Sequence, residues 1–248
     1  MNYLETLTPA ENLLLREKGG AGMRGLLKST LVDLLLKEVL VLYKETNRVS
    51  NRNDRPRHLS YVKRGPEYRR YRPLPHEQVF RAPFHSSDTR HLLRNLVSIA
   101  REKAASLPTY RSMITDSPRT RALWKRGILN RILGNARLNE AGLAAHNALM
   151  RELTAAEHSI VPELNARGAS AQRLLARLHG NVSLLEGLDP SLLPDVDGEG
   201  FGPRKPSGTD TGCGSACGSG CGASACGGHG CGGSGCGGSG CGGCGGCS

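Results

Sequence analysis

The sequence lacks a long uncharged apolar run of the kind that crosses a bilayer. Its most apolar stretch, residues 26–43, carries four charged side chains, and each of them is costly in hydrocarbon. Residues 1–11 contain neither a basic segment nor an apolar one, so we expect no secretory signal there. We therefore predict a cytoplasmic protein that has no transmembrane segment and that attaches at most peripherally to a membrane.

Charge is absent from residues 211–248, and cysteine is absent before residue 213. Nearly every position of 211–248 is Gly, Ser, Ala or Cys, a composition that cannot bury a hydrophobic core. Residues 195–210 are rich in Gly, Pro and charge, which is typical of a linker. We predict a folded body over 1–194, a linker over 195–210 and a disordered Gly/Cys-rich tail over 211–248.

The tail contains all nine cysteines, and the last three form a Cys-x-x-Cys-x-x-Cys run. Two thiolates at this spacing can reach one soft metal ion, so the tail could bind Zn or Cu(I). In a reducing compartment, metal ligands or modification targets are a better interpretation than disulfides. The candidate ligands are Cys213, Cys217, Cys221, Cys226, Cys231, Cys236, Cys241, Cys244 and Cys247.

Two alternatives for the tail stay open beside metal binding. One is a low-complexity extension that holds no metal. The other rests on residues 230–244, where Cys and Ser recur after Gly in the order Gly-Cys-Gly-Gly-Ser-Gly-Cys-Gly-Gly-Ser-Gly-Cys-Gly-Gly-Cys. This segment resembles the core of precursor peptides of thiazole/oxazole-modified microcins, and the resemblance implies cyclisation of Cys and Ser.

The body is strongly basic. The chain has 33 Lys and Arg against 22 Asp and Glu, a net charge of +11, and every Lys and Arg lies at or before Lys205. Such a surface favours polyanions as partners: nucleic acid, an anionic membrane surface or an acidic protein. The alternative is that the charge only keeps the protein soluble.

One stretch of the body concentrates cations and tyrosines. Arg forks match the geometry of phosphate, and tyrosine can stack on bases or lie at a headgroup boundary, so both phospholipid and nucleic acid are candidate partners. Its tyrosines are Tyr61, Tyr68 and Tyr71. The candidate anion-binding residues are Arg48, Arg52, Arg55, Arg57, Lys63, Arg64, Arg69, Arg70 and Arg72. A second basic cluster surrounds Trp124, which we interpret as a core residue.

Start and stop signals predict a mainly α-helical body with short β-hairpins. Thr8-Pro9-Ala10-Glu11 is a capping box, which predicts a helix up to Gly19, followed by a helix over 23–37. β-Branched and aromatic residues at 39–43 and 58–62 predict the two strands of a hairpin. Two helices before a hairpin with a basic tip suggest a winged-helix-like module. Prolines within 71–84 predict a connector, where the body could divide near 73–84.

Further helices are predicted after the connector. Residues 86–88 can cap a helix that carries an apolar stripe from Leu92 to Ala100, Pro108 should end it, and Pro118 should start another. Residues 136–142 suggest a short strand and turn before helices over 143–157 and 169–178. Leucines at 184, 185 and 188 should then fold back as a last apolar contact.

The residues at 7–15 and 26–40 resemble the start of the Golgi-phosphoprotein family. These are Leu-Thr-Pro-Ala-Glu-Asn-Leu-Leu-Leu and, after a glycine break, Leu-Leu-Lys-Ser-Thr-Leu-Val-Asp-Leu-Leu-Leu-Lys-Glu-Val-Leu. The resemblance covers about the first 45 residues. It implies a helical fold built from winged-helix-like pieces and, from the family's eukaryotic members, binding of phosphatidylinositol 4-phosphate in a basic pocket. No pocket residue can be transferred to this chain.

No motif in the sequence indicates catalysis. Gly19-Gly20-Ala21-Gly22 lacks the Lys-Ser/Thr end of a phosphate-binding loop, and no nucleophile elbow is present. We therefore expect a non-enzymatic protein whose basic body binds an anionic partner and whose tail is a mobile thiol-rich appendage. The alternative is a metal-handling or modified-peptide protein in which the tail is the functional element and the body a carrier.

Overall fold

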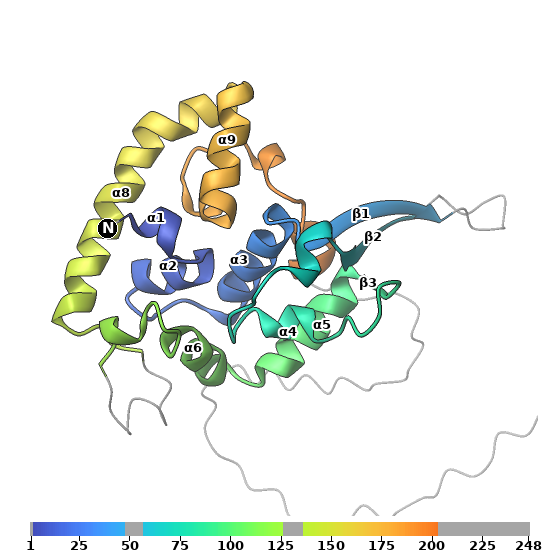
Figure 1. Cartoon of the computed structure of the whole chain (residues 1–248), viewed down its shortest axis with the longest axis horizontal. Helices are drawn as coiled ribbons and strands as arrows, with labels where there is room; N and C mark the ends of the chain where they lie inside the picture. Colours follow the sequence, from blue (N-terminus) through green and yellow to red (C-terminus); the bar gives the residue numbers. More distant parts are fainter. Residues whose placement is uncertain (1, 48–56, 126–135, 203–248) are drawn as a thin grey trace, which may run out of the picture. The chain divides into compact units, whose positions relative to one another are not determined.

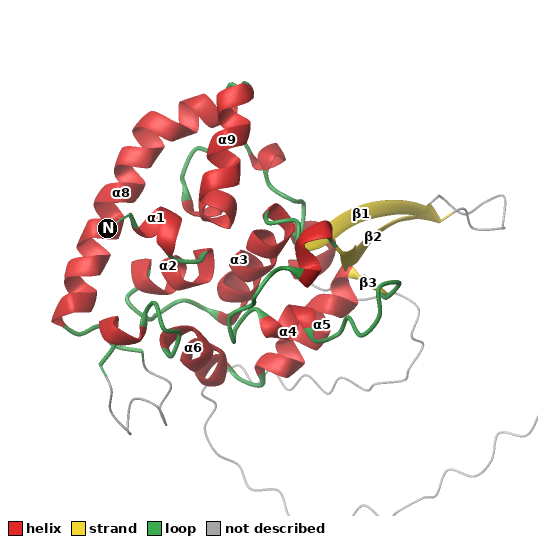
Figure 2. Cartoon of the chain, viewed as in Figure 1, coloured by secondary structure: helices red, strands yellow, loops and turns green. Residues whose placement is uncertain are grey.

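The computed structural model describes residues 2–47, 57–125 and 136–202, all within one compact unit, Met1–Arg204. This unit is mainly α-helical and contains one three-stranded antiparallel sheet (Figures 1 and 2). The tail and its nine cysteines lie outside the described residues, as do the second half of the predicted linker and the tip of the hairpin.

Three helices begin the chain: α1 (Tyr3–Thr6), α2 (Pro9–Arg16) and α3 (Met23–Leu36). The predicted capping box is confirmed, because the Glu11 N–H donates to Thr8 Oγ1 and the Thr8 N–H donates to the Glu11 carboxylate. Proline, which lacks an N–H, is well tolerated at the first position of α2, because an N–H there would have no acceptor within the helix. Both α2 and α3 bury most of their leucines in the core.

The sheet has the order β1-β2-β3, with β1 (Leu40–Asn47) and β2 (Arg57–Arg64) forming the predicted hairpin. Both strands extend beyond the predicted ranges, and Tyr43 lies opposite Tyr61. In Figure 1 the hairpin projects away from the helices. The third strand, β3 (Arg90–Leu92), pairs with β2 and was not predicted.

The predicted connector over 71–84 is wrong in part, because it contains the short helix α4 (Gln78–Arg81) and follows the 3-10 turn η1 (Pro66–Arg69). Its prolines lie outside α4, so they do not prevent a helical turn there. His76 and Glu77 are buried at the centre of the unit. The stretch 73–84 therefore lies inside one core and does not divide it.

Two helices follow, α5 (Leu93–Ala104) and α6 (Leu107–Thr115). The predicted cap of α5 at 86–88 is wrong, because Leu92 stands at the N-cap with no side-chain cap. Pro108 lies in the first turn of α6, where Ser106 caps the helix, so this proline begins a helix instead of only ending one. Ala105, at a φ of 58°, makes the turn between the two helices.

After α6, the described part of the helix predicted from Pro118 is a turn followed by the 3-10 helix η2 (Arg121–Leu123). Trp124 then pairs with Leu138 in an isolated antiparallel bridge. The short strand and turn predicted over 136–142 are therefore wrong in part, because α8 already begins at Glu140. The residues between, 126–135, lie outside the described part of the chain.

The long helix α8 (Glu140–Asn165) covers and exceeds the range predicted over 143–157, whereas α9 (Ala169–Leu178) has the predicted ends. In Figure 1 α8 runs along one side of the unit, with α1 and α2 between it and α3. The turns η3 (His179–Leu184) and η4 (Pro190–Leu192) complete this half. Leu184 and Leu185 are buried there and Leu188 packs against the core, which confirms the predicted apolar contact, although it is not the last one of the unit.

The predicted start of the linker at residue 195 is wrong, because the folded body continues beyond it. Residues Asp197–Phe201 form a helical turn, η5, and Val196 and Phe201 are buried. Asp195 and Asp197 form ion pairs with Lys44 (3.1 Å) and Lys28 (2.6 Å). The folded body thus extends through residue 202, because Val196 and Phe201 are buried in an otherwise polar segment and η5 packs on α5.

Candidate anion-binding surface

The sheet presents two different faces, since successive side chains of a strand point to opposite sides. Leu40 and Val62 are fully buried, and Ser60 is only 2% exposed, so their side of the sheet faces the core. Tyr43 and Tyr61 belong to the other side and are half-buried. We call this other side the outward face; it consists of Val41, Tyr43 and Glu45 of β1, Leu59, Tyr61 and Lys63 of β2, and Arg90 and Leu92 of β3.

An aromatic pair with two cations occupies the middle of the outward face. The Tyr43 and Tyr61 rings stack with their centroids 5.8 Å apart. The Lys63 ammonium lies 5.3 Å from the Tyr43 centroid, and the Arg90 guanidinium lies 5.1 Å from that of Tyr61. Cation–π attraction of this kind orients both cations on the face while leaving them in solvent.

Glu45 is the one acid of the outward face. Its carboxylate lies 2.8 Å from the Arg90 guanidinium. The pKa of Arg90 is raised by a hydrogen bond with Tyr43 and by the charge of Glu45, so the guanidinium stays protonated at every relevant pH. With Lys63 exposed and without an ion pair among the described residues, the face carries a net positive charge.

The predicted anion-binding residues fall into several environments. Arg48, Arg52 and Arg55 lie outside the described residues, and Arg57 begins β2. Lys63 is exposed on the outward face. Arg69, Arg70 and Arg72 are exposed in the segment after β2, where Arg70 lies 4.0 Å from Glu67.

Arg64 is directed into the body. Its guanidinium donates to the Phe84 carbonyl and lies 4.6 Å from the Tyr68 centroid. Arg81 covers the same ring at 4.3 Å and donates to the Tyr68 carbonyl at 2.8 Å. Tyr68 therefore packs with two guanidinium groups, and we remove Arg64 and Tyr68 from the candidate surface.

Sequence reasoning missed two of the four aromatic and cationic residues of the outward face, Tyr43 and Arg90. Tyr43 ended the predicted strand, and its pairing with Tyr61 follows only from the register of the hairpin. Arg90 falls inside the helix predicted after the cap at 86–88, whereas the structure places it in β3. The alternation of Val41, Tyr43 and Glu45 was the available signal for Tyr43, whereas the three residues of β3 are too few to show a period.

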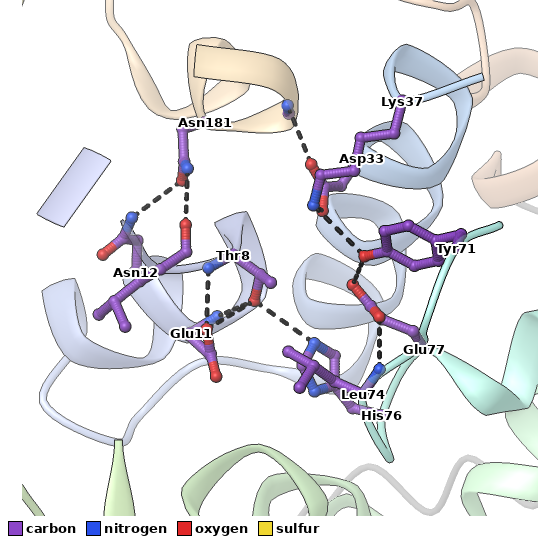
Figure 3. A network of polar contacts seen from close by, with 12 residues as sticks. Thr8, Glu11, Asn12, Asp33, Lys37, Tyr71, Leu74, His76, Glu77 and Asn181 are labelled. Carbon is purple, nitrogen blue, oxygen red and sulfur yellow. Dashed lines mark hydrogen bonds and ion pairs between the residues drawn. The ribbon is translucent and has the colours of Figure 1, made fainter. Parts of the chain in front are cut away.

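A second group of polar residues is buried in the core. Figure 3 shows Thr8 at its centre, where its hydroxyl donates to the Glu11 carboxylate at 3.1 Å and lies 3.4 Å from His76 Nε2. Beside them the Asn12 amide donates to the Asn181 side-chain carbonyl at 2.9 Å, and the Asn181 amide donates to two carbonyls of the α1 segment. These contacts join α2 to η3 and to the segment before α4.

The other half of this buried group connects α3 to the segment before α4. Lys37 lies 2.5 Å from the Asp33 carboxylate and 3.5 Å from the Tyr71 hydroxyl, which donates to Glu77 at 2.7 Å (Figure 3). The Glu77 carboxylate also accepts from the Leu74 N–H at 2.6 Å. The Gly180 N–H donates to Asp33 at 3.1 Å, so η3 is attached here as well.

Burial dominates the protonation states of these groups. It lowers the pKa of His76 to about 3, helped by the positive charges of Lys37 and Arg119, so the imidazole is neutral. Burial raises the pKa of Glu77 and of Tyr71. His76, Glu77 and Glu11 are all at most 1% exposed, so a substrate has no access to them and their hydrogen bonds hold the fold together.

Within the described ranges no group of three His, Cys, Asp or Glu side chains could hold a metal ion. None of the described helices is both long and apolar enough to span a bilayer.

Fold and site together define a mainly helical protein with a small antiparallel sheet whose outward face is cationic and aromatic. Beyond this class, the comparisons add no family: no protein-family model, no curated protein and no solved structure matches the chain.

Proposed function

We propose that this chain is a non-catalytic binding protein that attaches peripherally to anionic phospholipid surfaces through the outward face of its sheet. The observation that carries the proposal is the stacked Tyr43–Tyr61 pair on the projecting hairpin, flanked by Lys63 of β2 and Arg90 of the neighbouring strand β3. Tyrosine prefers the headgroup boundary of a bilayer, and each Lys or Arg near an anionic surface is attracted to it.

The arrangement of the rings favours a phospholipid over a nucleic acid. A base stacks on a free aromatic face, but Tyr43 and Tyr61 already pack against each other, and each has a cation over it. A headgroup needs only the two exposed cations and the half-buried tyrosines beside them. Val41, Leu59 and Leu92 add half-exposed aliphatic surface, which also suits a membrane boundary.

The winged-helix-like architecture is part of the same proposal. The helices α2 and α3 precede the hairpin β1-β2 in the order that such modules use, and the hairpin extends from them as a wing does (Figure 1). In this arrangement the core fixes the base of the hairpin through Leu40 and Val62. The wing can then present its outward face without disturbing the helices.

The test is sedimentation of the full chain with vesicles of neutral lipid, with or without an anionic phospholipid. We expect binding only to the anionic vesicles and a steep loss of it as salt rises. The variant K63Q/R90Q should weaken binding by about tenfold or more, because each charge near the surface contributes about fivefold. It also leaves Glu45 unpaired on the face, which adds repulsion.

The matched control is R101Q/R173Q, which removes two exposed cations from α5 and α9. It should bind nearly as well as the natural chain if the outward face makes the contact. Equal weakening by both variants would show a general charge effect and overturn the site. Binding to duplex or single-stranded DNA with a steep salt slope, without binding to vesicles, would favour the nucleic-acid alternative.

A second candidate function belongs to the tail, and the Cys-x-x-Cys-x-x-Cys run at Cys241, Cys244 and Cys247 favours it. In this proposal the tail handles a thiophilic metal, Zn or Cu(I), or is modified at its cysteines and serines, and the body is its carrier. The intact mass of the protein from its natural source tests it. Bound metal or losses of water support this function, and an unmodified metal-free mass contradicts it.

A further inference from the structure

The two cations of the outward face occupy directly opposite positions in neighbouring strands. Lys63 of β2 and Arg90 of β3 are partners in the antiparallel register. Side chains at such positions start about 5 Å apart on one face, and two like charges there repel each other. The pairing is therefore unfavourable for the sheet alone, whereas an anionic group placed between the two cations makes it a favourable contact.

The Arg90 side chain reaches away from this position. Its guanidinium lies 5.1 Å from the centroid of the Tyr61 ring and 2.8 Å from the Glu45 carboxylate. The outward-facing side chains form three successive rows across the strands: Val41, Lys63 and Arg90; Tyr43, Tyr61 and Leu92; Glu45 and Leu59. Arg90 therefore extends diagonally over Tyr61, from the row that it shares with Lys63 to the row of Glu45.

Glu45 thus occupies one of the two cations and leaves the other without a counter-charge. The Lys63 ammonium stays over the Tyr43 ring, 5.3 Å from its centroid, and forms no ion pair with any described residue. The Arg90 and Glu45 side chains are 56% and 44% exposed, so another anion has access to this ion pair.

The strength of the ion pair decides whether an anionic surface can replace Glu45. An exposed ion pair contributes little to stability, about as much as one Lys or Arg gains at an anionic lipid surface. The two contacts of Arg90 are therefore close in free energy, and the density of negative charge at the surface selects between them.

We propose that Glu45 is an autoinhibitory latch, which holds Arg90 away from Lys63 until an anionic headgroup takes the place of the Glu45 carboxylate. Arg90 then returns to its own row and binds the headgroup together with Lys63. A sparsely charged surface engages Lys63 alone, whereas a densely charged one engages both cations. The inference rests on the proposed function, because it concerns the regulation of the same outward face.

The variant E45Q opens the latch. We would measure binding of the full chain to phosphatidylcholine vesicles that contain an increasing fraction of phosphatidylserine, at constant ionic strength. At a low fraction E45Q should bind about fivefold more tightly than the natural chain, because Arg90 is available from the start. Its binding should also rise less steeply with the phosphatidylserine fraction. The control E163Q removes an exposed acid of α8 and should follow the natural chain.

Two further variants separate a latch from a simple effect of net charge. E45D keeps the charge but shortens the side chain by one methylene, so it reaches Arg90 less well and should bind vesicles about twofold more tightly than the natural chain. R90Q should weaken E45Q about fivefold but the natural chain only about twofold, because there Glu45 competes for Arg90. Equal factors in both backgrounds, or E45D binding as the natural chain does, would overturn the proposal.

Failure of this inference and failure of the proposed function give different results. If the natural chain and E45Q bind the vesicles equally well, the latch is wrong and the outward face remains a membrane site. If E45Q binds and the natural chain does not, Glu45 inhibits as inferred, and membrane attachment of the natural chain is wrong. If neither binds at any phosphatidylserine fraction, both proposals are wrong.

Discussion

The outward face of the sheet and the segment that follows it, residues 65–84, contain the same kinds of side chain in different environments. On the sheet, Lys63 and Arg90 cover tyrosine rings but remain exposed. In the segment after β2, Tyr68 is covered by Arg81 and by Arg64 from the end of β2, and both arginines donate to backbone carbonyls inside the body. A dense run of Arg and Tyr in the sequence therefore includes both binding surface and core, and only the pairing partners tell them apart.

This comparison predicts that removing Tyr68 lowers the free energy of unfolding more than removing Tyr61 does. The change Y68A removes a ring that packs with two guanidinium groups and with Phe84. We expect a loss of about 3 kcal/mol in the free energy of unfolding, because a cavity forms and the two arginines lose their partner. Urea denaturation followed by circular dichroism measures it. A loss below about 1 kcal/mol would place Tyr68 with the surface residues.

The buried group beside this segment predicts a pH dependence of stability. The imidazole of His76 has its pKa lowered to about 3 in the folded state, whereas in the unfolded chain it is about 6.5. The unfolded state therefore takes up the proton first, and stability falls as the pH drops below about 6.5 until it reaches about 3. Between pH 6.5 and 5 this costs about 2 kcal/mol.

The variant H76Q isolates this contribution, because glutamine does not titrate. It should be less stable than the natural chain at pH 7. Between pH 6.5 and 5, however, its free energy of unfolding should fall by about 2 kcal/mol less than that of the natural chain. Burial raises the pKa of Glu77, so Glu77 makes the folded state more stable as the pH falls, which is opposite to the effect of His76. Because Glu77 is present in both proteins, its contribution cancels in the comparison. Parallel curves of unfolding free energy against pH would show that His76 is not buried as a neutral group.

The smallest expected effect on stability is at Tyr61. The change Y61A removes half of the stacked pair on the outward face, and we expect a loss of less than about 1 kcal/mol in the free energy of unfolding. Its affinity for anionic vesicles should fall several-fold, because the ring at the headgroup boundary and the support of Arg90 are both lost. If Y61A instead lost much stability and bound vesicles as before, Tyr61 would be a core residue like Tyr68 and not part of a binding surface.

Local signals predicted much of the helical framework. The capping box at Thr8 and Glu11 specifies the start of α2 through side-chain contacts within one turn, and the range of α9 follows from its apolar period. The hairpin follows from two β-rich runs. These features depend on neighbours in the sequence, which is why they could be read from it.

The errors come from contacts between distant segments. β3 exists because Arg90 and Leu92 pair with Lys63 and Tyr61, and no local pattern of three residues contains that information. Burial of Phe201 against α5 likewise overrides the polar composition around it. For the candidate surface, the sequence showed which residue types were present, but the sides of the strands on which they lie depend on the register.

Among the described residues after 194, the buried Val196 and Phe201 determine where the folded unit can be cut. A shortened protein that ends at residue 194 loses Val196 and Phe201 and also the ion pairs of Asp195 and Asp197. The apolar side of α5 that they cover would then face water and promote aggregation. Ending at residue 202 removes the cysteine-rich extension and keeps that cover, so it is the boundary to choose when the helical unit is produced alone.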